Sequence, residues 1–128
     1  MKGNRHQGWR VALLELTRFE VPRIGESLAP NVQAPLRELG LWSEFLALGP
    51  LPSWGTCSLW GDTVQQSHSH LLNPYGCGWH VDRRAFDHML AHGAAAAGAC
   101  LVEGVALQRS VYRKGCWWLQ SKRPAKPP

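Results

Sequence analysis

Long apolar stretches and paired cysteines are absent from this chain of 128 residues. No run approaches the roughly 18 apolar residues of a membrane-spanning helix, and the N-terminus lacks the apolar core of a signal peptide. We therefore expect no membrane contact and a cytoplasmic location. The four cysteines include no Cys-x-x-Cys pair, so we expect reduced thiols that pack as small apolar residues.

The spacing of ligands that zinc requires is also lacking. His68, His70, Cys77 and His80 are the nearest approach to a ligand set, but they are not paired as in zinc knuckles or fingers. We expect no metal site. We interpret residues 65–75 as a polar loop with exposed histidines.

Positive charge is concentrated at the ends of the chain. Residues 109–128 contain six Lys or Arg and no acid, whereas residues 24–108 contain three Arg and seven acids. The net charge of +5 therefore does not form a uniform basic face, which argues against a nucleic-acid partner. A nucleic-acid binder with a basic tail stays an alternative, but we expect Trp117 and Trp118 to pack against their own hairpin.

The strongest structural signal is a short apolar run near the N-terminus. Val11 to Leu14 is continuous and apolar, as in a strand that is buried on both faces of a parallel sheet. Glu15 then ends this strand at the edge where open α/β sheets bind ligands, and its oxygens can accept hydrogen bonds from both hydroxyls of a ribose. The alternative is a solvated carboxylate at the end of a strand.

The remaining patterns predict one small α/β domain. A helix capped by Asn31 is expected to end at Gly40, and a second helix covers residues 41–48. Asp82 is placed to cap a longer helix that ends at Gly98. The expected strands cover residues 52–61, 78–81 and 100–102, followed by a hairpin of residues 105–112 and 116–120.

Three segments, in order, resemble the FAD-dependent monooxygenase and flavin-dependent halogenase superfamily, which has the p-hydroxybenzoate hydroxylase type of FAD-binding fold. They are the strand that ends in Glu15, the loop RIGESLAP at 23–30, and GWHVDRRAFDHML at 78–90 with Gly98-Ala99 after it. The resemblance covers about residues 8–120. It implies a partial Rossmann-like FAD-binding domain with a small antiparallel hairpin or meander in residues 1–120, and a basic, Pro-rich, disordered tail in residues 121–128.

One family feature is missing from the sequence. Members begin with a strand and a Gly-x-Gly-x-x-Gly turn that approaches the FAD pyrophosphate, and the ten residues before Val11 contain no such turn. We therefore expect a fragment that begins at the second strand of the Rossmann-like domain and is shortened at both ends.

The resemblance also implies which residues contact FAD. Arg83, in the first turn of the long helix, is expected to reach the phosphates; the alternative is an i,i+4 pair with Asp87. Arg23 matches a cofactor-contacting position, Gly25 lets the backbone approach the flavin, and Glu26 bonds polar groups near the ring or braces the loop. The backbone at Val105 and Ala106 is expected beside the adenine. No catalytic residue is identified.

The expected function is that of an FAD-dependent oxidoreductase, similar to a monooxygenase or halogenase, that acts on a small organic substrate with NAD(P)H or a flavin reductase as the electron source. Two absences count against halogenation. No lysine lies between Lys2 and Lys114, and the Trp-x-Trp-x-Ile-Pro signature of tryptophan halogenases is missing. The alternative is a non-catalytic remnant or interaction module of the same fold.

Overall fold

The computed structural model describes residues 10–59, 61 and 65–123. The first nine residues and the last five, including most of the expected tail, lie outside this range. Ser121 and Lys122, which the sequence assigns to that tail, are the last residues of strand β9 (Cys116–Lys122).

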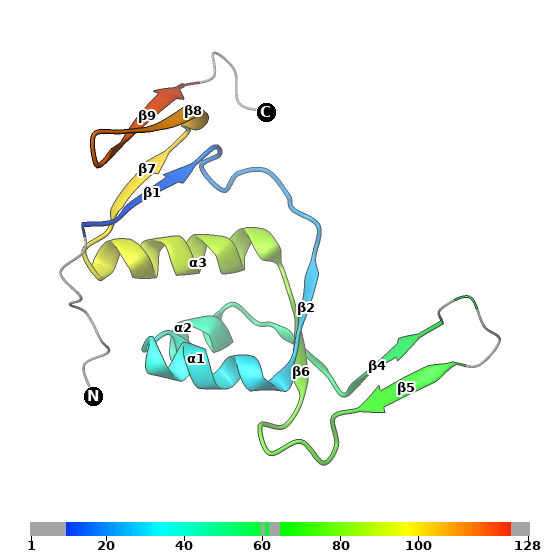
Figure 1. Cartoon of the computed structure of the whole chain (residues 1–128). Coiled ribbons are helices and arrows are strands. Elements are labelled where there is room, and N and C mark those ends of the chain that lie inside the picture. The colour runs from blue at the N-terminus through cyan, green and yellow to red at the C-terminus, as the bar shows by residue number, and fades with distance from the viewer. Residues whose placement is uncertain (1–9, 60, 62–64, 124–128) are drawn as a thin grey trace.

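A pair of parallel strands forms one side of the molecule. β1 (Ala12–Glu15) pairs with β7 (Cys100–Glu103), and Glu15 lies opposite Glu103. This confirms the predicted strand, its parallel partner and the position of Glu15 at the strand's end. Figure 1 shows helix α3 (Arg83–Ala96) running along one side of the pair.

The burial predicted for β1 is wrong. Val11 is 56% exposed and Leu13 is 37% exposed, whereas both were expected to be buried. The reason is the size of the sheet: within the described residues β1 pairs with β7 alone, and α3 covers only one side of the two strands. A strand is buried on both faces only when other elements pack on both faces.

A second, antiparallel sheet holds β6 (Gly78–Val81) between β2 (Glu26–Leu28) and β3 (Leu51–Ser53). The 3-10 helix η1 (Pro30–Val32) and the short helices α1 (Gln33–Glu38) and α2 (Trp42–Ala47) connect β2 to β3. Apolar side chains from α1, α2, α3 and β6 pack together and form the core of the molecule: Leu36, Phe45, Val81, Phe86 and Met89.

Aromatic rings make up much of this core. Phe45 is fully buried. Its ring centre lies 5.3 Å from that of Trp42 in a stacked arrangement, and 5.8 Å from those of Trp79 and Phe86 in edge-on arrangements. The aromatic part of the core therefore lies between the short helices, β6 and α3.

Helix α3 begins and ends as predicted. The Asp82 side chain accepts a hydrogen bond from the backbone N–H of Arg84 at 2.9 Å, and Gly98 follows the helix with φ +102°. Gly93 lies within the apolar stripe, where glycine weakens a helix. A Cβ at this position would lie 3.0 Å from Leu41 side-chain atoms, so glycine lets α3 pack closely against the start of α2.

The predicted start of the first helix is wrong. Asn31 does not cap α1; it lies inside η1, and neither helix has a side-chain cap. The physical reason is Pro30, whose fixed φ favours the first position of a helical turn and so starts the turn one residue earlier.

Two antiparallel hairpins complete the described chain. β4 (Gly55–Ser58) pairs with β5 (Gln66–Ser69), and β8 (Ala106–Arg113) pairs with β9. The single strand predicted for residues 52–61 is wrong, because Trp54 separates β3 from β4. The polar loop predicted for residues 65–75 is also wrong in part, since β5 is a strand and His70 is only 7% exposed.

The described residues contain no membrane-spanning helix, no group arranged to hold a metal ion and no disulfide. No helix there is long and apolar enough to cross a membrane. No group of His, Cys, Asp or Glu in the same part of the chain is arranged to hold a metal ion. All four cysteines are free; Cys77 is buried and the other three are exposed.

The burial of Leu36 leads to a prediction about stability. Leu36 is 3% exposed and Leu72 is 98% exposed. We expect Leu36→Ala to lower the free energy of unfolding by about 2 to 5 kcal/mol, because the substitution leaves a cavity. The matched change Leu72→Ala should alter it by less than about 0.5 kcal/mol. Urea titration followed by circular dichroism measures both; equal effects would contradict the assigned core.

Candidate functional site

Glu15 lies where the sequence predicts a ligand-binding carboxylate, at the carboxyl end of the β1–β7 pair. Its Oε1 accepts hydrogen bonds from the Thr17 N–H at 3.0 Å, from the Thr17 hydroxyl at 2.8 Å and from the Arg23 guanidinium at 2.7 Å. Among the described residues Oε2 accepts none. The carboxylate is therefore fixed through one oxygen, while the other stays available.

Arg23 joins this strand end to helix α3. One of its terminal nitrogens bonds to Glu15, and the other donates to Asp87 Oδ2 at 2.7 Å. The guanidinium also lies over the Phe19 ring, with its central carbon 5.1 Å from the ring centre. Phe19 is buried and has φ +60°, a conformation that is uncommon for a residue with a side chain, so the loop after β1 turns sharply to place this ring.

Arg83 continues the chain of charges. Its Nε donates to Asp87 Oδ1 at 3.0 Å, and a terminal nitrogen donates to the Glu26 carboxylate. The i,i+4 pair with Asp87, which the sequence left open as an alternative, is thus present in the structure. Because the Arg83 side chain is 36% exposed and that of Glu26 is 48% exposed, their mutual contact lies at the surface.

We use the term ion-pair network for Glu15, Arg23, Glu26, Arg83 and Asp87. Four of its members were predicted from the sequence as site residues, and the structure brings these four together. Asp87 was not among them, although it bonds to both arginines. In the sequence, only the i,i+4 spacing from Arg83 indicated a role for Asp87. Its contact with Arg23 joins positions 64 residues apart, and no local sequence pattern predicts it.

The network lowers the pKa of two carboxyl groups. Burial acts to raise the pKa of Glu15, but hydrogen bonds from Thr17 and the nearby charge of Arg23 outweigh it, and the pKa is lowered. Burial likewise acts to raise the pKa of Asp87, and the hydrogen bonds and charges of Arg83 and Arg23 lower it. Both groups are therefore held as carboxylates at neutral pH.

The other predicted site residues lie close to the network. Gly25 directly precedes Glu26, and a Cβ added to it would meet only the Val81 carbonyl, at an ordinary 3.5 Å. Packing within the chain thus does not require glycine at this position. The Val105 N–H donates to the Glu15 carbonyl at 3.0 Å, so Val105 and Ala106 lie beside the end of β1. The Val105 N–H is therefore already hydrogen-bonded within the chain.

The residues fit the sugar end of FAD better than its phosphates. Glu15 offers a free carboxylate oxygen, the acceptor that a ribose hydroxyl needs. The two arginines are outnumbered by three carboxylates, so the network has a net charge of −1 as it stands. A pyrophosphate would bind here only if Arg83 exchanged a carboxylate for a phosphate oxygen, and its partial exposure permits this exchange.

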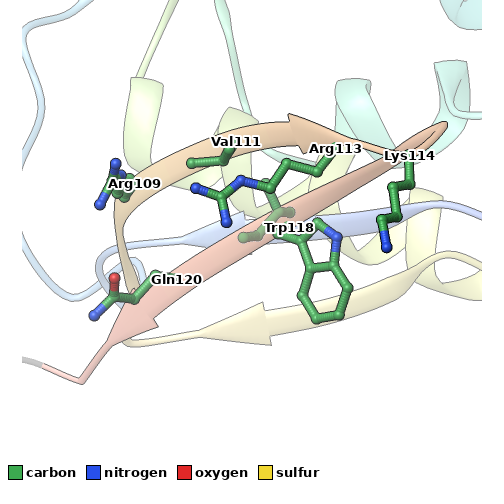
Figure 2. Close-up of a pocket in the computed structure, with 7 residues that line it drawn as sticks. Arg109, Val111, Arg113, Lys114, Trp118 and Gln120 are labelled. Atoms are coloured by element: carbon green, nitrogen blue, oxygen red, sulfur yellow. The ribbon is translucent and has the colours of Figure 1, made fainter.

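A second surface lies on the β8–β9 hairpin, apart from the network. One face of the hairpin borders a cavity of about 520 Å³, and Figure 2 shows Arg109, Arg113, Lys114 and Trp118 around it. Trp118 is 68% exposed and Trp117 is 65% exposed. As expected, Trp117 packs against its own hairpin, with its ring centre 5.2 Å from that of Tyr112 on β8. Both rings nevertheless stay largely exposed, because two strands alone cannot cover large rings on both faces.

Comparison with known proteins identifies relatives that cover most of this chain. No family model matches it. The chain is 29% identical over 120 residues to LodB of Marinomonas mediterranea, described as an FAD-dependent oxidoreductase. The match covers 93% of this chain and 32% of LodB. The chain is 28% identical over 105 residues to the flavin-dependent halogenase armH3 of Armillaria mellea, which covers 80% of this chain and 21% of armH3.

Solved structures show the same relationship. The structure of the myxobacterial chondrochloren halogenase CndH matches with a TM-score of 0.70 and 26% identity. The match covers 88% of this chain and 30% of the CndH chain. CmlS, a flavin-dependent halogenase, matches with a TM-score of 0.67 at 24% identity, over 91% of this chain and 24% of its own, and supports the fold alone. The predicted resemblance and the α/β fold class are confirmed; the roles of the individual site residues stay predictions.

The lowered pKa of Asp87 leads to a prediction about pH. A carboxyl whose pKa is lowered on folding stabilises the protein above its unfolded value, near 3.8, and this contribution is lost as the pH falls through the folded value. At pH 7 we expect Asp87→Asn to lower the free energy of unfolding by about 1 to 2 kcal/mol, because two arginines lose a charged partner. The difference from wild type should shrink below about pH 4.

Urea titrations at several pH values measure this difference. Glu38→Gln is the matched control, because Glu38 is an exposed carboxylate on α1, and it should change stability little at any pH. A penalty for Asp87→Asn that is independent of pH would contradict a charge-based role for the network.

Proposed function

We propose that this chain, a relative of FAD-dependent oxidoreductases and flavin-dependent halogenases, binds FAD at the ion-pair network. The observation that carries the proposal is the position of Glu15, fixed through Oε1 at the end of a parallel strand, while Oε2 accepts no hydrogen bond from the residues that the structure describes. This is the edge at which open α/β sheets bind nucleotides.

Glu15 then accepts hydrogen bonds from the hydroxyls of a ribose. Arg23 holds the Glu15 carboxylate in place from one side, and Thr17 holds it from the other. Arg83, two ion pairs further along the network, turns from Glu26 or Asp87 toward the pyrophosphate, to which a guanidinium donates two parallel hydrogen bonds.

The remaining predicted residues complete the contact with FAD. Gly25 permits close approach of the backbone to the flavin end, since nothing in its own packing requires glycine. Glu26 bonds polar groups nearby. Because the Val105 N–H already donates to Glu15, we assign the adenine contact to the Val105 carbonyl and to Ala106.

The bound FAD would supply the redox chemistry, and the residues described here would bind it and orient it. Since the chain spans 32% of LodB and 21% of armH3, the activity of a whole protein is part of the proposal. We propose oxidation of a small organic molecule, with NAD(P)H or a flavin reductase as the electron source. A non-catalytic module would bind FAD without turnover.

Substitution of Glu15 tests the proposed cofactor site. We expect FAD to bind to the 128-residue chain and Glu15→Gln to weaken binding about tenfold or more, because the ribose hydroxyls lose a charged acceptor. Glu38→Gln, on the exposed side of α1, should bind as wild type does. Calorimetric titration with FAD, and with ADP to isolate the nucleotide half, measures both. Equal affinities for wild type and Glu15→Gln would contradict the assignment.

A second candidate function is supported by the β8–β9 hairpin. Its described part, residues 106–123, contains five Lys or Arg and no acid. Arg109, Arg113 and Lys114 lie on the same face as the exposed Trp118, as Figure 2 shows. Cations beside an exposed ring suit single-stranded nucleic acid, since the cations pair with phosphates and the ring stacks on a base.

Binding to a single-stranded DNA oligonucleotide tests this candidate. If the hairpin binds DNA, affinity should fall steeply as salt rises, and Trp118→Ala should weaken binding about 5-fold or more. Trp117→Ala is the matched control, because adjacent residues of a strand face opposite sides and Trp117 contacts Tyr112 instead. Fluorescence anisotropy measures both; equal losses for the two variants, or binding that is insensitive to salt, would exclude the candidate.

A further inference from the structure

The two faces of the β8–β9 hairpin differ in charge. Residues that pair across two antiparallel strands share a face, and the faces alternate along each strand. The pairs that include Tyr112 with Trp117 therefore define one side, which we call the aromatic face: Leu107, Ser110, Tyr112, Trp117, Leu119 and Ser121. Arg109 and Arg113 hold the alternate positions and lie on the other side, with Trp118. The aromatic face thus contains no charged residue.

The large side chains of the aromatic face are open to solvent. Trp117 is 65% exposed, Tyr112 60%, Leu119 56% and Leu107 51%, although Leu119 also borders the cavity on the basic side. Figure 1 shows the hairpin on the side of the β1–β7 pair that faces away from α3, so the buried core does not cover it. Because a two-stranded hairpin is marginally stable alone, an apolar face of this kind indicates a contact surface.

The distribution of charge decides which partner fits this surface. Nucleic acid and anionic lipid would be attracted to the cations, which lie on the opposite face. The partner of the aromatic face must instead be apolar and uncharged. A second copy of the chain supplies such a surface, and the cations of both copies then point outward, away from each other.

The size of the aromatic face is sufficient for a weak dimer. If the contact covers the exposed parts of its four large side chains, each copy buries roughly 400 to 500 Å². The total of roughly 1,000 Å² lies at the lower limit of specific protein–protein interfaces. The association is therefore expected to depend on protein concentration.

We propose that two copies of this chain pack their aromatic faces together around a two-fold axis. In such a contact Trp117 of one copy lies against the partner's Tyr112, and the symmetry repeats the contact in reverse. The Tyr112 and Trp117 rings of one copy already lie 5.2 Å apart at an angle of 54°, so each hairpin presents a preformed aromatic surface. The dimer completes a two-layered sheet packing that one hairpin cannot form alone.

Sedimentation equilibrium of the full 128-residue chain tests the proposal. A reductant is present, because three of the four cysteines are exposed and could form disulfides between copies. We expect a monomer–dimer equilibrium with a Kd of about 1 to 100 μM. A chain that stays monomeric up to about 1 mM would overturn the proposal.

The effect of salt distinguishes this dimer from association through charge. Residues 106–123 contain five Lys or Arg and no acid, so two hairpins repel each other at long range. We expect the Kd to fall about twofold or more when NaCl rises from about 0.05 to about 0.5 M, because salt screens this repulsion. A Kd that rises with salt would show that the basic side binds an acidic surface of the other copy, and it would overturn the proposal.

Two neighbouring tryptophans provide matched variants. Trp117→Ala should weaken the dimer about tenfold or more, because the ring is removed from the centre of the contact. Trp118→Ala removes an equally exposed ring from the opposite face and should leave the Kd unchanged. Equal effects of the two substitutions would refute the aromatic face as the interface.

A second pair of variants keeps the test valid if Trp117→Ala unfolds the hairpin. Ser110→Lys places a charge within the aromatic face and should abolish the dimer, because both copies would bury that charge without a partner. Gln120→Lys adds the same charge on the basic side and should not. A dimer that survives Ser110→Lys would contradict the proposal.

Vesicles that contain phosphatidylserine test the alternative occupant. We expect no vesicle binding that depends on Trp117. Sedimentation of the wild-type chain with the vesicles, together with its loss in Trp117→Ala, would assign the aromatic face to a membrane surface and overturn the dimer. The ion-pair network contributes no residue to this face, so we expect the dimer with and without FAD.

Discussion

Arg23 donates to two carboxylates from different layers of the molecule, Glu15 at the end of β1 and Asp87 on helix α3. These bonds fix the strand pair against the helix and set the direction of the loop between β1 and β2. The side chains are only 17 to 27% exposed, so removal of one partner leaves the others as poorly solvated charges. The orientation of Glu15, and with it the candidate cofactor site, depends on this bridge.

The two bonds of Arg23 matter for the position of the strand pair because the parallel strands bury little apolar surface. The buried apolar cluster lies among α1, α2, α3 and β6, and none of its buried members comes from β1 or β7. Val11, Leu13 and Leu16 are all substantially exposed. In most α/β domains apolar packing on both faces fixes the strands; here the two ion pairs of Arg23 add a direct link between β1 and α3.

Local sequence patterns predicted the elements and the site residues that depend on neighbours along the chain. Asp82 as a helix cap, Glu15 at a strand end and the hairpin of β8 and β9 all follow from rules that span a few residues. The i,i+4 pair of Arg83 and Asp87 was visible for the same reason. By contrast, the contact between Arg23 and Asp87 joins segments 64 positions apart, and nothing in either segment encodes it.

Burial was the least predictable property, because it depends on what packs from elsewhere. A run of four apolar residues predicted a buried strand, but the described part of the sheet has only two strands and leaves much of β1 exposed. His70 shows the opposite error. Its polar neighbours predicted an exposed loop, yet its N–H donates to the carbonyl of Trp54, which lies between β3 and β4, and its own carbonyl accepts from the Asn73 N–H.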